Sequence, residues 1–377
     1  MSGRKITLAL ISIISLVILY LNYNDNSIKS KELFSKDTTE ANDISLPQIP
    51  LSMKVQVINS GTKKNEDTGV FECLPDITFD EEASMENITH YLRSLDNLFS
   101  ESAPLYYAMY ANPPEGETRV DLLFEYYDQF PNNPVVSMDL ISLCANSSDK
   151  RCTSNFIKDA IDADSNNGAM WFSAISFYAT KGDDQRVMES IEALEKTSFF
   201  NERLGEKALL YAQALEGSTS NDFNVNAITG VGKAMSVSPS YSSVTRWCKQ
   251  GLDEYVKAYA CLTLGKQLET RSKIAISNVI GIELQKYVFE FKGETDAIQL
   301  IEKNRIKLME RPGEGIYLKA SIMLILDERL LRSWLHNLDL HGEIESQRLM
   351  ILEAEIIYGG NQNYLCTLIY EMLDGFL

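Results

Sequence analysis

Apolar side chains recur at helical spacing from residue 81 almost to the carboxyl end of the chain. Val187, Ile191 and Leu194, for example, follow one another at intervals of four and three residues, which is the period of an amphipathic helix. Farther along, the same spacing predicts helices at 275–289, 295–309, 314–326 and 343–358. The last of these runs into Gly359-Gly360, a sequence typical of a helix carboxyl cap. We therefore predict an all-α fold for residues 81–377.

The amino terminus has a different pattern. Residues 6–21, sixteen positions without a charge, follow Arg4 and Lys5, and a helix of that length rises about 24 Å. Because the next residues lack the small-x-small pattern of a cleavage site, we predict an uncleaved signal-anchor helix at 1–23. The short basic tail favours a cytoplasmic amino terminus, so the expected location is the bacterial inner membrane, single-pass, with a periplasmic body. The alternative is a cleaved signal peptide and a soluble periplasmic protein.

Two segments separate this predicted anchor from the helical region. Residues 24–50 are mostly polar and have the composition of a linker. Residues 51–80 contain short alternating patterns at 53–58 and 69–73. These patterns predict a short extended or β-like segment, with minor β structure at most.

The helical region contains a repeat. The pairs Asn132-Asn133 and Asn166-Asn167 lie 34 residues apart, and a fixed period of this length is typical of stacked helical hairpins. The same frame gives units at 100–133, 134–167 and 168–201, and a fourth unit runs from 202 to about 240 with a loop at 218–224 that adds about five residues. We therefore predict successive helical hairpins from residue 100 to about residue 240.

The unit 168–201 resembles a tetratricopeptide repeat. Trp171, Ala174 and Tyr178 match the aromatic, small and tyrosine positions that fill the space between neighbouring hairpins in that family. Gly182-Asp183 matches the tight turn between its two helices, where glycine supplies backbone freedom. The resemblance implies a right-handed superhelical stack of TPR-like hairpins over residues 81–241. Residues 242–377 are then either degenerate repeats or a separate helical cap.

The repeat resemblance also implies a concave surface lined by the first helix of each hairpin. Positions expected to face that side carry small or mildly apolar side chains. They suggest a groove for a peptide or helix of a partner, formed by Met138, Ser142, Phe172, Ser176 and Ala179.

The chain has six cysteines and no CxxC motif, and an even number fits disulfides in an exported protein. In the repeat frame, Cys144 ends a first helix and Cys152 opens the second helix of the same hairpin, so their Cα atoms fall within the range that a disulfide requires. Two further cysteines face each other across a turn near residue 253. We predict the pairs Cys144–Cys152, Cys248–Cys261 and, as the remainder, Cys73–Cys366. Buried free thiols in a reducing compartment are the alternative.

The net charge and the sequence motifs limit which partners and which kinds of reaction we expect. The formal net charge is −18, from 53 acidic and 35 basic residues. Nucleic-acid binding needs clustered Lys and Arg to neutralise phosphates, so we expect no nucleic-acid partner. The sequence has no nucleophile elbow, no phosphate-binding glycine loop and no paired metal-ligand histidines. We therefore predict no catalytic residues, no cofactor and no metal.

Together these patterns favour a membrane-anchored interaction scaffold whose partner is another protein or peptide of the cell envelope. One alternative is an enzyme that processes an envelope polymer through a carboxylate site in the C-terminal helical region. The other is a signal-cleaved, soluble periplasmic binding protein. A carboxylate pair with raised pKa values in a deep cleft would favour the enzyme, and a continuous open groove would favour the scaffold.

Overall fold

A computed structural model describes residues 102–216, 223–309, 317, 320–321, 323–325 and 327–358. Every regular element in this part of the chain is a helix, and no strand occurs in it. The predicted all-α class is therefore confirmed for the described residues. The predicted anchor at 1–23, the linker, the β-like segment and the pair Cys73–Cys366 lie outside them. Among the described helices, none combines the length and the apolar character that crossing a membrane requires.

From α3 to α10, two α-helices fall within each of the four predicted units. Helices α14 and α17 have the predicted bounds, and α13 continues three residues past the predicted end at 289. The helices are α3 (Ala103–Tyr110), α4 (Arg119–Gln129), α5 (Pro134–Asn146), α6 (Ser154–Ile161), α7 (Gly168–Lys181), α8 (Asp184–Lys196), α9 (Leu204–Ala214), α10 (Phe223–Ser236), α11 (Tyr241–Gln250), α12 (Tyr255–Arg271), α13 (Ala275–Lys292), α14 (Thr295–Met309), α16 (Glu328–His341) and α17 (Glu343–Tyr358).

The 34-residue period marks the caps of the first helices. The side chain of Asn133 accepts hydrogen bonds from the first free backbone N–H groups of α5, and Asn167 accepts one at the start of α7. Asn167 also exchanges two hydrogen bonds with the backbone of Asn201, which lies 34 residues farther along. An amide at this position satisfies donors that have no partner inside the helix. The repeated asparagine therefore fixes where α5 and α7 begin.

The five residues that match the repeat family lie in the α7–α8 hairpin. Ala174 and Tyr178 are buried on α7, and the partly buried Trp171 donates a hydrogen bond to a carbonyl of the preceding turn. Gly182 ends α7 with a φ of +70°, a conformation that glycine adopts without steric cost. Asp183 caps α8 with its carboxylate.

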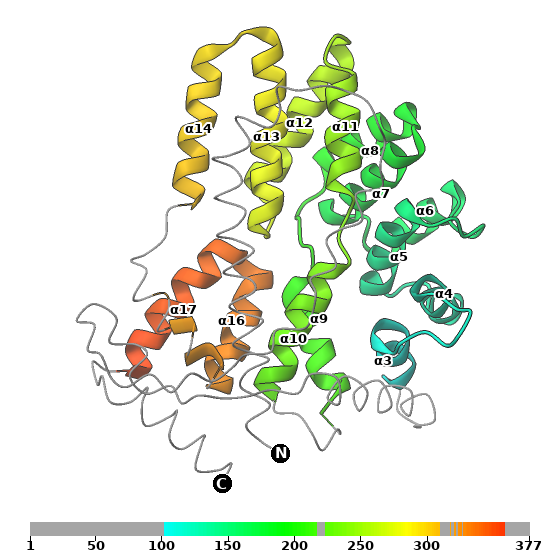
Figure 1. Cartoon of the computed structure of the whole chain (residues 1–377), viewed down its shortest axis with the longest axis vertical. Coiled ribbons are helices and arrows are strands. Elements are labelled where there is room, and N and C mark those ends of the chain that lie inside the picture. The colour runs from blue at the N-terminus through cyan, green and yellow to red at the C-terminus, as the bar shows by residue number, and fades with distance from the viewer. Residues whose placement is uncertain are drawn as a thin grey trace, which may run out of the picture.

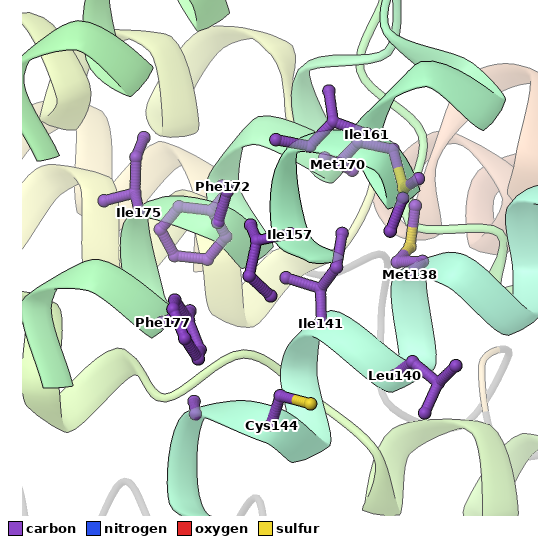
Figure 2. Packing of buried hydrophobic residues seen from close by; sticks show 14 of the residues in the cluster. Met138, Leu140, Ile141, Cys144, Ile157, Ile161, Met170, Phe172, Ile175 and Phe177 are labelled. Atoms are coloured by element: carbon purple, nitrogen blue, oxygen red, sulfur yellow. The ribbon is translucent and has the colours of Figure 1, made fainter. Parts of the chain in front are cut away.

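Helices α3–α8 and α11–α13, with one face of α9, share one hydrophobic core, which we call the stack core. Helix α5 packs against α7, α7 against α11, and α8 against α12, so hairpins lie side by side (Figure 1). At the far end, α14 packs on α13. Figure 2 shows the centre of this core, where Ile141, Ile157 and Phe172 from α5, α6 and α7 are buried together. Burial of such large apolar side chains stabilises the hairpins.

A second hydrophobic core, which we call the α9–α16 core, unites α9, α10, α16, α17 and described positions between 320 and 325. Helix α9 takes part in both cores. Leu204 and Ala208 face the α9–α16 core, whereas Tyr211 and Leu215 close the α9 end of the stack core. In Figure 1, α9 and α10 accordingly stand between the stack and the pair α16–α17. The division expected at residue 241 therefore does not separate the two cores.

Two disulfides lie in the described residues, and they join two of the predicted pairs. Cys144 and Cys152 have Cα atoms 5.3 Å apart and link α5 to the segment before α6. Cys248 and Cys261 have Cα atoms 5.7 Å apart and link α11 to α12. Each disulfide thus closes one hairpin of the stack core and restricts its unfolded chain.

Candidate functional site

The predicted partner groove is not open to solvent. Met138, Ser142, Phe172 and Ser176 each have an exposed fraction of 5% or less, and Ala179 is partly buried. The expectation that these side chains form an accessible groove is therefore wrong. The repeat resemblance placed these side chains on one surface, but it carries no information about which distant segment covers that surface.

The connection between α10 and α11 covers this surface. The backbone N–H of Ser240 donates a hydrogen bond to Ser176 Oγ at 2.6 Å. The ring of Tyr241 lies against that of Phe172, with 5.4 Å between the centroids. The α10–α11 connection and the start of α11 therefore cover this part of α7, and α11 takes the place beside α7 that the fourth unit was expected to fill.

This cover is incomplete and leaves a cavity of about 250 Å³ between the two cores. Helices α5 and α7 form one wall, and α9 with the end of α10 forms the opposite wall. Cavities between packed units are common ligand sites. The lining is mostly apolar and includes Met138, Phe172, Leu204, Met235, Tyr241 and Ile274.

Glu202 is the one acidic residue among the described residues that line this cavity. Its carboxylate accepts hydrogen bonds from the hydroxyl of Ser272 and from the backbone N–H of Lys273, the latter at 3.1 Å. Burial raises the pKa of the Glu202 carboxyl above its ordinary value, and these hydrogen bonds only partly oppose that rise. Ionisation of the Glu202 carboxyl group therefore costs free energy at this position.

Lys207 is the one basic residue among the described lining residues, and its charge is matched by Asp139. The Nζ and Oδ1 atoms are 2.5 Å apart, and both side chains are buried. Burial raises the pKa of the Asp139 carboxyl, while the Lys207 ammonium and, more weakly, Arg119 act in the opposite direction. Tyr110 donates a hydrogen bond to the Lys207 carbonyl at 2.8 Å. This group ties α3 and α5 to α9.

The other carboxyls with raised pKa values do not complete an acid–base pair in the cavity. Asp339 lies on α16, where burial raises its pKa and the backbone N–H of Gly205 donates to its carboxylate at 3.0 Å. It is not among the residues that line the cavity. Within the described part of the chain, no group of His, Cys, Asp and Glu side chains is arranged to hold a metal ion.

Asp139, Glu202 and Lys207 were not predicted from the sequence. One of them had a visible signal, because Asp139 is the only charged residue of the helix Pro134–Asn146, and a lone charge among apolar residues needs a partner. Glu202 and Lys207 lie among other charged residues. Nothing local distinguishes their places in the structure.

Searches of protein-family models, curated proteins and solved structures find no match to this chain.

Proposed function

We propose that this protein is a helical-repeat scaffold that binds another protein of the bacterial cell envelope, with residues 1–23 anchoring it in the inner membrane. The observation that carries the proposal is the succession of hairpins α3–α4, α5–α6 and α7–α8. The first helices of the last two are capped by asparagines 34 residues apart. Stacked hairpins present extended surfaces that suit protein partners. The repeat-like positions on α7 and in the turn that leads to α8 support a superhelical, TPR-like arrangement.

The disulfides support an exported body. Cys144–Cys152 and Cys248–Cys261 both close short hairpins, and such bonds persist in oxidising compartments such as the periplasm. This agrees with the basic flank before the apolar run at 6–21, which favours export of the following chain. The scaffold would therefore meet its partner outside the cytoplasm.

The first turns of α12 are the contact surface that we favour, because the concave positions of α5 and α7 are covered. Tyr255, Val256 and Tyr259 are 78%, 64% and 60% exposed. The two tyrosines lie one helical turn apart and share a face, and tyrosine is enriched at protein interfaces. The exposed carboxylates of Asp253 and Glu254 precede them. Together with the net charge of −18, they favour a basic partner.

Site-specific photo-crosslinking in cells tests this proposal. A photoreactive residue at position 259 should capture one discrete protein, whereas the same residue at the exposed Thr270 on α12 should not. The capture should disappear when Val256→Asp is introduced, because the substitution places a charge in the apolar contact. Equal capture from both positions, or capture that Val256→Asp leaves unchanged, would contradict the proposed surface.

The two alternative functions have weaker support. An acid–base enzyme needs a second catalytic group, and Glu202 is the only carboxyl among the described residues that line the cavity. No observation in the described residues favours the enzyme. A soluble periplasmic protein would have the same fold but a different mature amino terminus. Intact mass measurement distinguishes the cleaved chain from the uncleaved one.

A further inference from the structure

The size of the cavity between the two cores suits a small organic ligand. Its volume is about 250 Å³, whereas a dry apolar cavity of roughly 150 Å³ already binds benzene. A molecule with an apolar body somewhat larger than one aromatic ring would therefore fill it. The exposed Met235 and Ser238, at the end of α10 and just beyond it, belong to the lining, so this side of the cavity reaches the surface.

The lining selects against highly polar ligands. Met138, Phe172, Leu204 and Ile274 present hydrocarbon or thioether groups, and a sugar or phosphate buried against them would lose hydrogen bonds to water without replacement. Ser142 and Ser173, which also line the cavity, are hydrogen-bonded to each other at 3.2 Å. The walls thus favour an alkyl or aromatic group.

Charge distinguishes one part of the lining. Lys207 is neutralised by Asp139, and Arg203, next to Glu202 in the chain, pairs with Asp164 and Glu206. Among the described residues, Glu202 is hydrogen-bonded by neutral donors and forms no ion pair. The cavity therefore carries one carboxyl group whose charge, when it ionises, no cation of the described chain balances.

We propose that this cavity binds an organic ammonium ion, with its apolar body between α5, α7 and α9 and its ammonium group at Glu202. An opposite charge close to a buried carboxylate offsets the cost of its ionisation. An apolar body of this size gains free energy as it leaves water. A free amine and a lysine side chain of a protein partner share this chemistry. The proposal does not rest on the scaffold function.

The matched pair 2-phenylethylamine and 2-phenylethanol tests the proposal. The two molecules differ chiefly in one ammonium group in place of one hydroxyl, so they isolate the charge. Titration calorimetry on the purified full chain at pH 7.5 should show tighter binding of the amine. Glu202→Gln should weaken binding of the amine about tenfold or more and should change binding of the alcohol less than about twofold. Retained alcohol binding also shows that the variant is folded.

A second variant tests the location independently of Glu202. Ala234→Leu adds volume at a lining position of α10, so it should weaken the amine and the alcohol alike. A capped lysine peptide, titrated in parallel, distinguishes the two sources of the ammonium group: tighter binding of the peptide assigns the site to a protein partner, and tighter binding of phenylethylamine assigns it to a small molecule. The proposal is overturned if the amine binds no better than the alcohol, or if Glu202→Gln weakens both equally.

Discussion

The stack core and the α9–α16 core are held together in different ways. In the stack core, hairpins that are neighbours in the sequence pack large side chains such as Phe172 and Ile141, and two disulfides close individual hairpins. The α9–α16 core joins segments far apart in the chain, and a glycine marks their contact. Gly205 on α9 donates to Asp339 on α16, which is 134 residues away.

The two cores differ in how closely segments that are far apart in the sequence approach one another. A Cβ atom added at Gly205 would lie 2.2 Å from the Leu335 carbonyl oxygen, so α9 and α16 approach more closely than side chains allow. The stack depends on repeated local signals, whereas the α9–α16 core depends on contacts between segments far apart in the chain, this close approach among them. Because α9 belongs to both cores, its substitutions should have the largest effects.

The largest expected effect comes from Lys207→Met, which acts where the two cores meet. It removes the ammonium group from the buried Asp139 carboxylate, and such a loss costs about 3–5 kcal/mol of unfolding free energy. Urea denaturation measures it. The double variant Asp139→Leu with Lys207→Met should recover most of this loss, because no buried charge is left without its partner. A double variant as unstable as the single one would show that the charge is not the cause.

A smaller loss is expected from Gly205→Ala, and it should be confined to one core. The added methyl group meets backbone and Asp339 atoms, and overpacking of this kind costs about 1–3 kcal/mol. Hydrogen exchange should accelerate in α16 and α17 and stay unchanged in α5 and α7. Gly232→Ala on α10 is the control, since nothing lies within 4 Å of its added Cβ, and it should stabilise the helix by about 0.5–1 kcal/mol. Equal acceleration in both cores would contradict their separation.

Substitution of the two asparagine caps tests what holds the stack core together. Asn167→Ala removes the cap of α7 and two hydrogen bonds to Asn201, with an expected loss of about 2 kcal/mol. Asn133→Ala removes the cap of α5 and should cost about 1 kcal/mol. Thermal and urea denaturation of both variants measure the difference. If the two losses are equal, the bonds to Asn201 contribute nothing.

The smallest expected effect is a change with pH at Glu202. Because burial raises the pKa of this carboxyl, the folded chain holds the proton more tightly than the unfolded chain does. The carboxyl's contribution to stability therefore falls as pH rises above the unfolded-state value of about 4.3. In the ligand-free chain, the unfolding free energy of the natural protein relative to Glu202→Gln should decrease between about pH 4 and pH 7. An increase over this window would contradict the raised pKa.

Individual helix starts and turns of the stack core were predictable because their signals are local. Asn133 and Asn167 stand at the helix starts, and Gly182 marks the turn. The repeat resemblance placed Met138 and Phe172 on one surface, and both line the cavity.

The cover over that surface was not predictable from the same signals. The spacing of Leu204, Ala208 and Tyr211 predicts a single amphipathic helix. It does not indicate that these residues belong to two different cores. Gly205 likewise has no local signature, because its role depends on Leu335, which is 130 positions later in the chain. For the same reason the placement of Glu202 and Lys207 at a cavity could not be predicted.

Thiol labelling at position 176 tests most directly whether the α9–α11 segment closes the face of the stack. Ser176→Cys places a thiol under the α10–α11 connection, and Ser238→Cys places one at the exposed end of that connection. In the folded chain, peptide mapping after brief alkylation should show rapid modification at position 238 and almost none at position 176 until the chain unfolds. Equal rates at the two positions under native conditions would show that the groove is open and would contradict the account.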